Sequence, residues 1–291
     1  MPFERGAAPL FRGERWLNRT LIGVVLAYVG ILLAAPCAAL ARGAFAGGGA
    51  VLWRELARPD VLSAFRLTLA LALGAVALNT VFGVLTAWVL VRHSFPGRRM
   101  LNALVDMPFA VSPVVAGYML ILLFGRGGWL AGWVEWSGFR VVFSWPGMLL
   151  ATVFVTMPFV VREVMPVLRE FGAEPEEAAA TLGAGPWRIF WRVTLPSVRW
   201  GLLYGVALTL ARALGEFGAV YVVSGAVQGR TETAPLFVFR ALDERLTVAA
   251  YGVSLVLALL SFSLITALGA YQKREEEKIS PRGPGAEREA A

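Results

Sequence analysis

Long apolar runs without charged residues recur along the chain and predict membrane-spanning helices. Each run is about long enough to cross a bilayer core of roughly 30 Å. A sixth run, from about Ser197 to Val223, is interrupted by Arg212 and Glu216. The five uninterrupted runs are Thr20–Leu40, Leu67–Val91, Met107–Phe124, Val141–Val161 and Leu246–Ala270. The pattern predicts an all-α membrane protein with six transmembrane helices, which places both termini on one side of the membrane.

The composition also indicates a membrane protein. Of the 291 residues, 57% are hydrophobic and 16% are charged. The mean hydropathy of +0.65 is too high for a soluble domain of this length. The first apolar run follows a basic start, as in a secretory signal peptide. It is longer than the apolar region of a typical signal, however, and further runs follow it.

Basic residues are distributed unequally between the two sides of this topology. The side that carries the termini has sixteen, and the other side has eight. Because Lys and Arg near span ends are retained in the cytoplasm, we predict that both termini and the polar segment Glu176–Pro196 are cytoplasmic. The net charge of +7 follows from this asymmetry. It needs no nucleic-acid partner, and the apolar composition makes membrane lipid the expected surroundings of the chain.

Residues for covalent or metal-dependent chemistry are scarce. The only lysines are Lys273 and Lys278, so the chain contains no GxxxxGK[ST] phosphate-binding loop. The only histidine, His93, lies in a short basic loop, where a solvated side chain is favoured over a zinc ligand. There is no GxSxG motif, and the single cysteine, Cys37, suits packing in the first run. We therefore expect no catalytic residue, metal site or cofactor.

The segment Glu176–Pro196 is a polar island that predicts two short helices. In the first, Pro175 suits the first turn, acidic residues favour the positive end of the helix dipole, and Gly183 suits the stop. Such a helix is too short to be stable alone in water, so something must pack against it. In the second, Trp187 and Trp191 share one face, as expected at a membrane interface, and Leu195-Pro196 ends the helix.

An ordinary cytoplasmic loop would also account for this composition, but the spacing of the motifs favours a more specific reading. The order Glu177-Ala178-Ala179, Gly183, and Val193-Thr194-Leu195-Pro196 closely resembles the EAA…G…I-x-LP signature of the permease subunits of ATP-binding-cassette (ABC) importers, with valine in place of isoleucine. In that family the short helix is a coupling helix that docks on the ATPase. The resemblance implies this role for about residues 174–183, with Glu177, Ala178, Ala179, Gly183, Leu195 and Pro196 as its motif residues.

Two further stretches resemble a narrower group of permeases. The sequences DMPFAVSPVVAGYML (106–120) and ARALGEFGAVYVVSG (211–225) resemble the sulfate/thiosulfate permeases, particularly the W-type subunit. This implies a type I importer fold, a second homologous permease, two copies of an ATPase and a periplasmic sulfate-binding protein. Phe237 and Phe239 depart from the polar residues expected in the last external loop. Molybdate and tungstate permeases share the GEFGA pattern and remain an alternative, and a passive anion channel is an alternative of a different class.

Arg212 and Glu216 are the chemically most informative residues inside the predicted spans. A lone charge at mid-bilayer costs roughly 3 kcal/mol on insertion scales, and the i,i+4 spacing makes these two residues partners. Either they form a purely structural ion pair, or they lie beside the anion path, with Arg212 supplying positive potential. Asn79 and Ser112 are weaker candidates for the path, and both could simply bond to a neighbouring helix.

Together these expectations divide the chain into three parts. Residues 1–60 comprise the cytoplasmic N-terminus, the first transmembrane helix and an external loop. Residues 61–268 form the permease core, and residues 269–291 form a cytoplasmic tail, disordered from about Gln272 because it is rich in Glu, Arg, Gly and Pro. The expected location is the bacterial cytoplasmic membrane.

The topology can be tested with reporter fusions. Because the basic residues are concentrated on one side, we expect reporters fused after Arg99 and after Tyr271 to report a cytoplasmic location. A reporter fused after Arg140 should report the periplasm. A cytoplasmic signal at Arg140 would contradict the six-span topology.

Overall fold

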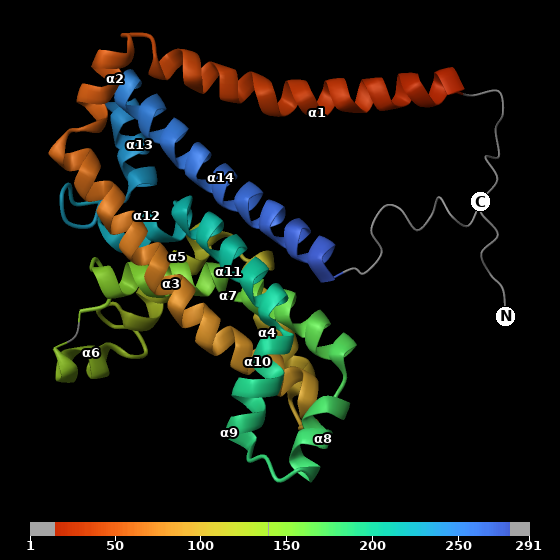
Figure 1. Ribbon diagram of the computed structural model, residues 1–291. Helices are drawn as coiled ribbons and strands as arrows, with labels where there is room; N and C mark the ends of the chain where they lie inside the picture. Colours follow the sequence, from red (N-terminus) through yellow and green to blue (C-terminus); the bar gives the residue numbers. More distant parts are fainter. Residues whose placement is uncertain (1–14, 139, 280–291) are drawn as a thin grey trace.

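The computed structural model describes residues 15–138 and 140–279, and this part of the chain consists of helices and short connections without a β-strand (Figure 1). The α-helices are α1 (Arg15–Ala44), α2 (Gly49–Leu56), α3 (Pro59–Arg92), α4 (Arg98–Ala110), α5 (Pro113–Phe124), α6 (Ala131–Ser137), α7 (Trp145–Phe171), α8 (Glu174–Thr181), α9 (Pro186–Ile189), α10 (Leu195–Ser197), α11 (Arg199–Leu214), α12 (Gly218–Ser224), α13 (Ala234–Asp243) and α14 (Thr247–Ile279), and a π-helix, η1 (Phe190–Thr194), lies between α9 and α10.

Four helical segments are long and apolar enough to cross a membrane without a break. They are α1 from Arg19, α3, α7, and α14 as far as Tyr271. Two bent pairs raise the number to six if each pair counts as one span. These pairs are α4 with α5, bent by 116°, and Pro186–Ser197 with α11, bent by 71°. By length and composition, the described residues are therefore consistent with six spans.

The third predicted span is wrong as a continuous helix. Met107–Phe124 crosses a break between α4 and α5. Pro113 starts α5, and a proline disfavours helical backbone in the residue before it. Ser112 accordingly has ψ 138°, and Val111 also lies in extended backbone with ψ 130°. Hydropathy cannot detect this break because the residues around it are uncharged.

Other predicted boundaries were wrong because hydropathy stops at a charge where a helix does not. Helix α7 continues beyond Val161 to Phe171, and the interrupted run from about Ser197 to Val223 is divided among α10, α11 and α12. Helix α14 runs to Ile279. Residues 272–279, which were predicted to be disordered, are therefore helical. The rest of the predicted tail and the first fourteen residues lie outside the described part of the chain.

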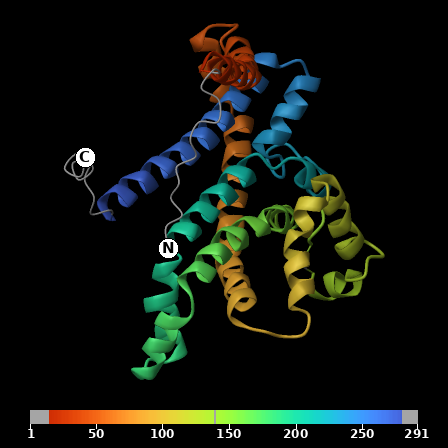
Figure 2. The ribbon, with the colours of Figure 1, turned by 90° about the vertical axis from the view of Figure 1, so that its right-hand side faces the viewer.

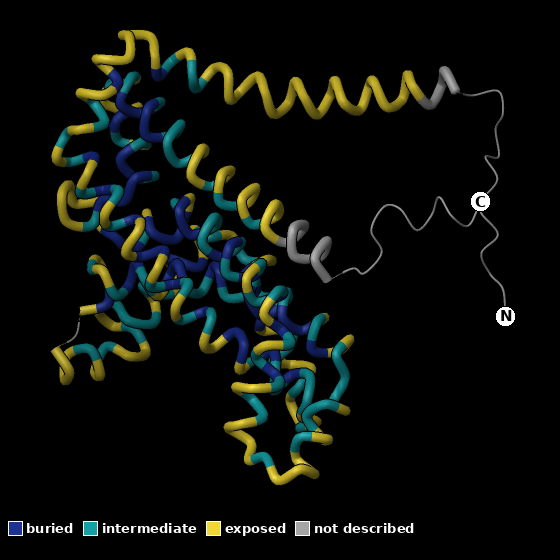
Figure 3. Tube along the Cα trace, in the orientation of Figure 1, coloured by how far each residue is buried: buried dark blue, intermediate teal, exposed yellow. Residues whose placement is uncertain are grey.

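The core lies where α3 crosses α7 and α11. Small and branched residues fill it, including Ala87, Leu90, Val160 and Val164, all fully or almost fully buried. Figure 3 shows this buried zone as dark blue segments along α3, α7 and α11. A second buried cluster, around Phe237, packs α13 between α3 and α14. The long helices are thus held together at two levels along α3.

Glycines allow α11 to approach α7 closely. A methyl group added at Gly205 would lie 2.9 Å from the Cα of Val160, and one at Gly201 would lie 2.6 Å from the backbone oxygen of Glu163. Both distances are shorter than a normal carbon contact. Lipid tails are as apolar as the side chains, so no hydrophobic driving force brings membrane helices together. Small residues such as these glycines instead allow close van der Waals packing between the helices.

Helix α1 projects away from the other helices, which Figures 1 and 2 show from two sides. None of the apolar segment that qualifies it as a span is buried. It meets α14 at one end, where Gly43 packs against the ring of Tyr251. The remaining apolar surface of α1 is that of a helix that faces lipid or another subunit.

The close approach at Gly205 can be tested by Gly205→Val. The added side chain must push α11 away from Val160, and overpacking of this kind costs roughly 1–3 kcal/mol. We expect a lower thermal unfolding midpoint in detergent. The matched control is Gly30→Val in α1, where nothing lies within 4 Å of an added methyl group. Equal midpoints for the two variants would contradict the packing.

Candidate functional site

Helix α8 lies at one end of the molecule and has the start and stop that the sequence predicts. Pro175 lies in its first turn, and three acidic residues occupy that turn. At its other end Gly183 has φ +83°. The Gly183 N–H donates to the Ala180 oxygen at 2.9 Å, and the Ala184 N–H donates to the Ala179 oxygen at 3.0 Å. This pair of bonds is a Schellman motif, so the predicted glycine stop is confirmed.

Glu176 joins α8 to the membrane helices. Its carboxylate accepts a hydrogen bond from Arg92 Nε at 2.8 Å and another from the Thr194 hydroxyl at 2.7 Å. Arg92 also donates to the backbone oxygen of Gly172 at 2.5 Å. The side chains of Arg92 and Glu176 are only 12% and 14% exposed. We call Arg92, Glu176 and Thr194 the α8 clamp, because they tie α8 to the end of α3 and to η1.

The other face of α8 is open. Glu177 and Ala178 are exposed, Ala179 is half-buried, and Leu182 is 88% exposed. A large apolar side chain and a carboxylate thus face outward on a helix whose opposite side is held by the α8 clamp.

The second short helix of the polar island is confirmed, and it ends next to the predicted Leu195-Pro196, before the bend into α11. It begins at Pro186, and the rings of Trp187 and Trp191 lie 5.6 Å apart on one face. It passes through the π-helix η1 and continues to Ser197. Pro196 has no N–H to donate, and the wider turn of a π-helix before it accommodates that loss.

The predicted ion pair between Arg212 and Glu216 is confirmed. Arg212 Nη1 lies 2.6 Å from Glu216 Oε2, and the Glu216 side chain is 1% exposed whereas that of Arg212 is 33% exposed. The second oxygen of Glu216 accepts the backbone N–H of Ala219 at 3.0 Å, at the start of α12. Glu216 is therefore fixed by two partners. Arg212 makes no other described polar contact and keeps donors on its exposed side.

Two helix breaks come together next to this pair. Helix α12 starts at Gly218, where a methyl group would lie 3.1 Å from Pro113 Cβ at the start of α5. A methyl group at Gly117 would lie 2.8 Å from the Ala219 oxygen. The two helices therefore run side by side from adjacent breaks. Ser112 lies exposed at this junction as the residue that precedes α5.

Asn79 is buried inside the helix bundle. Its amide donates to the Thr156 hydroxyl at 2.8 Å and to the Val153 oxygen at 3.2 Å, both in α7. Asn79 itself is 1% exposed. The structure therefore shows the alternative in which Asn79 bonds to a neighbouring helix.

The two phenylalanines in the last predicted external loop occupy different environments. Phe237 is fully buried in the cluster that packs α13 between α3 and α14. Phe239 is exposed and its ring lies 5.5 Å from that of Phe217. Next to it, Arg240 donates two hydrogen bonds to Glu232, at 2.7 and 3.1 Å. These bonds raise the pKa of Arg240 above its ordinary value, so Arg240 stays protonated in its pair with Glu232.

No group of three or more metal-ligating His, Cys, Asp or Glu residues occurs among the described residues.

Comparison with known proteins decides the family. Residues 79–279 match the model of the family described as "Binding-protein-dependent transport system inner membrane component". The chain belongs to this family. It is therefore a multi-pass permease component of the inner membrane.

Its relatives in this permease family include sulfate transport proteins. The chain is 50% identical to the sulfate transport system permease protein CysW of Synechococcus elongatus, over 90% of this chain and 91% of the relative. It is 45% identical to CysW of Escherichia coli K12, over 92% of each chain. It is 40% identical to CysT of the same strain, over 89% of this chain and 93% of that relative. As a member of this family, the chain is a component of a membrane transport system.

Solved structures share the permease fold. A chain of a bacterial ABC transporter for the import of the acidic polysaccharide alginate aligns with a TM-score of 0.74 at 17% identity, covering 89% of this chain and 96% of that chain. A chain of the MetNI methionine transporter aligns with a TM-score of 0.55 at 18% identity, over 73% and 94% of the two chains. The predicted type I importer fold is confirmed.

The sequence alone did not reveal the residues that hold α8 in place. It singled out Glu177, whereas Glu176 makes the buried contacts. It also missed Arg162 of α7, which donates to Asp106 Oδ1 at 2.6 Å and to Asn102 Oδ1 at 3.0 Å in α4. The signal for the α8 clamp was available in part, because an arginine ends an apolar run at Arg92. Nothing in the spacing joins that arginine to a residue more than eighty positions later.

The α8 clamp can be tested by comparing two adjacent glutamates. Glu176→Gln keeps the shape of the side chain but leaves Arg92 without its counter-charge, so we expect unfolding to cost roughly 2 kcal/mol less. Glu177→Gln is the matched control and should leave stability unchanged, because Glu177 is exposed. Thermal unfolding of the purified chain measures both. Equal effects would contradict the clamp.

Proposed function

We propose that this chain is the permease subunit of an ATP-driven importer that translocates sulfate or thiosulfate across the cytoplasmic membrane. The substrate is supported by the relatives from Synechococcus elongatus and Escherichia coli, which are named for sulfate transport. We propose further that α8 and both termini lie on the cytoplasmic side, because the basic residues are concentrated there.

The proposed assembly contains a second homologous permease, a pair of ATPases and a sulfate-binding protein. The second permease is supported by the relatives, since Escherichia coli K12 has both a CysW and a CysT protein that match this chain. The binding protein is supported by the solved alginate transporter, which was crystallised in complex with an alginate-bound periplasmic protein. Its permease fold aligns with a TM-score of 0.74.

The α8 clamp is the observation that carries the coupling role. Helix α8 is open on one face and held on the other by Arg92 through Glu176. A push on the open face therefore reaches the end of α3 directly, and it reaches η1 and α10 through Thr194. We assign the ATPase contact to α8, with the motif residues Glu177, Ala178, Ala179, Gly183, Leu195 and Pro196.

We assign the anion path to the junction of the two helix breaks. Glu216 is held by Arg212 and by the start of α12, so it positions Arg212 with donors left on the exposed side. An arginine of this kind supplies positive potential inside the membrane, where an anion has no water. The start of α5, next to Ser112, adds the positive end of a helix dipole at the same junction. Asn79 stabilises the bundle beside this path.

Transport of labelled sulfate tests the function. In proteoliposomes that contain the assembled complex and its binding protein, we expect uptake of [35S]sulfate to require ATP and to be inhibited by excess thiosulfate. Inhibition by molybdate or tungstate alone would favour the alternative substrate. Uptake without ATP or binding protein would contradict the importer and favour a passive channel.

Exchange of the intramembrane pair separates its two roles. Each single variant, Arg212→Glu or Glu216→Arg, should lose uptake at least tenfold, because it leaves a buried charge unpaired. The double exchange should restore assembly but leave uptake defective, because the cation then lies at the buried position. The control is Arg126→Gln, which removes a positive charge from an exposed loop residue outside the pair. Full recovery of uptake in the double exchange would remove Arg212 from the path.

A further inference from the structure

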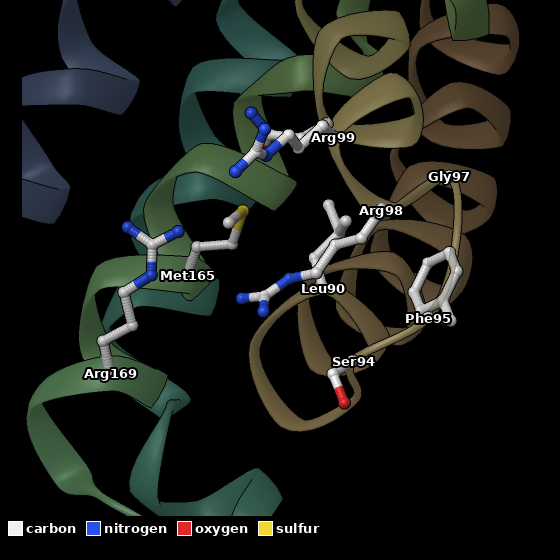
Figure 4. Close-up of a pocket in the computed structure, with 9 residues that line it drawn as sticks. Leu90, Ser94, Phe95, Gly97, Arg98, Arg99, Met165 and Arg169 are labelled. Atoms are coloured by element: carbon white, nitrogen blue, oxygen red, sulfur yellow. The ribbon is translucent and has the colours of Figure 1, made fainter.

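A second basic site lies at the α8 end of the molecule, apart from the pair in the spans. The loop after α3, the first turns of α4 and the end of α7 enclose a pocket of about 570 Å³. Three arginines line it, namely Arg98, Arg99 and Arg169. In Figure 4 their guanidinium groups project from α4 and α7 toward a common space beside Met165.

These three arginines lack the carboxylate partners that neighbouring arginines have. At the same end of the molecule Arg92 is paired with Glu176, and Arg162 is paired with Asp106. Within the described residues, none of the three pocket arginines makes an ion pair. Three guanidinium groups around one cavity repel one another unless an anion lies between them. The pocket therefore has the charge of an anion site without a protein anion to fill it.

The remaining lining indicates what kind of anion fits. Helix α4 begins at Arg98, which lines the pocket, so the positive end of its dipole lies at the site. The floor is apolar, because it consists of Leu90 and Met165. These residues are 1% and 2% exposed. Along α4, Met100 and Leu104 form an exposed apolar row, 68% and 44% exposed, that leads away from the pocket.

We propose that this pocket binds one tetrahedral oxyanion at the α8 side of the membrane. Planar guanidinium groups match phosphate and sulfate oxygens bidentately. The oxyanion has two sources of the same chemistry, the phosphate of an anionic phospholipid or free sulfate. Basic pockets between membrane helices on the cytoplasmic side suit lipid phosphates, and the apolar row on α4 suits an acyl chain. None of the lining residues belongs to the proposed transport path, so the proposal does not depend on that path.

Binding by the full-length chain, purified within its transporter complex, tests the proposal in two arms. In the first, native mass spectrometry follows dioleoylphosphatidylglycerol against dioleoylphosphatidylcholine. In the second, equilibrium dialysis in detergent follows [35S]sulfate. The variants are Arg99→Gln and Arg169→Gln, whose side chains are exposed, and the triple variant with Arg98→Gln. Near a membrane surface each arginine contributes about fivefold to the affinity for an anionic lipid, so the triple variant should bind roughly a hundredfold more weakly.

A matched control removes the same charge elsewhere at this end of the molecule. The triple variant Arg188→Gln, Arg192→Gln, Arg199→Gln has the same net charge but an intact pocket, and it should bind as the wild type does. Saturable binding of either probe that is weakened by the pocket variants alone supports the proposal, and the probe that binds identifies the source. If neither probe binds the wild type, or if pocket and control variants lose binding equally, the proposal is wrong.

Discussion

The ion pair between Arg92 and Glu176 is the interaction on which the rest of this permease depends. A helix of eight residues cannot be stable alone in water, and a nearly buried guanidinium needs a counter-charge. The pair meets both needs at once, and the Thr194 hydroxyl adds the next helix to the same carboxylate. Helix α8 is thereby joined to α3 and, through η1 and α10, to α11. These two helices cross α7 in the buried core.

Inside a membrane, charges and helix breaks need partners. This requirement also explains the arrangement of the helices in the interior. Arg162 continues α7 past the apolar run because Asp106 accepts its hydrogen bonds. Glu216 is buried because Arg212 and the start of α12 hold it. Gly218 lets α12 start directly against α5. Charge and irregular backbone thus come together at one junction, between the end of α11 and the starts of α5 and α12.

Much of this structure could be predicted from local chemistry. Apolar length predicts the unbroken spans, and the pattern of Pro175 and Gly183 predicts α8 with its stop. Prediction failed where a distant partner decides the outcome. A hydropathy scan ends a helix at Arg162, because its score does not include a distant partner such as Asp106. It also runs through Ser112, because the backbone effect of the following proline carries no charge. Likewise Glu177 fitted the motif, but only the tertiary structure shows that Glu176 reaches Arg92.

The central claim is that α8 passes the motion of an ATPase to the membrane helices, and site-specific crosslinking tests it most directly. Cys37 is the only cysteine, so a Cys37→Ala background accepts single cysteines at Ala178 and Leu182 on the open face of α8. In the assembled complex both should crosslink to cysteines in the ATPase surface, with yields that change when nucleotide is added. Trp53→Cys, exposed on α2 at the other end, should not crosslink. Absence of crosslinks from both α8 positions would contradict the account.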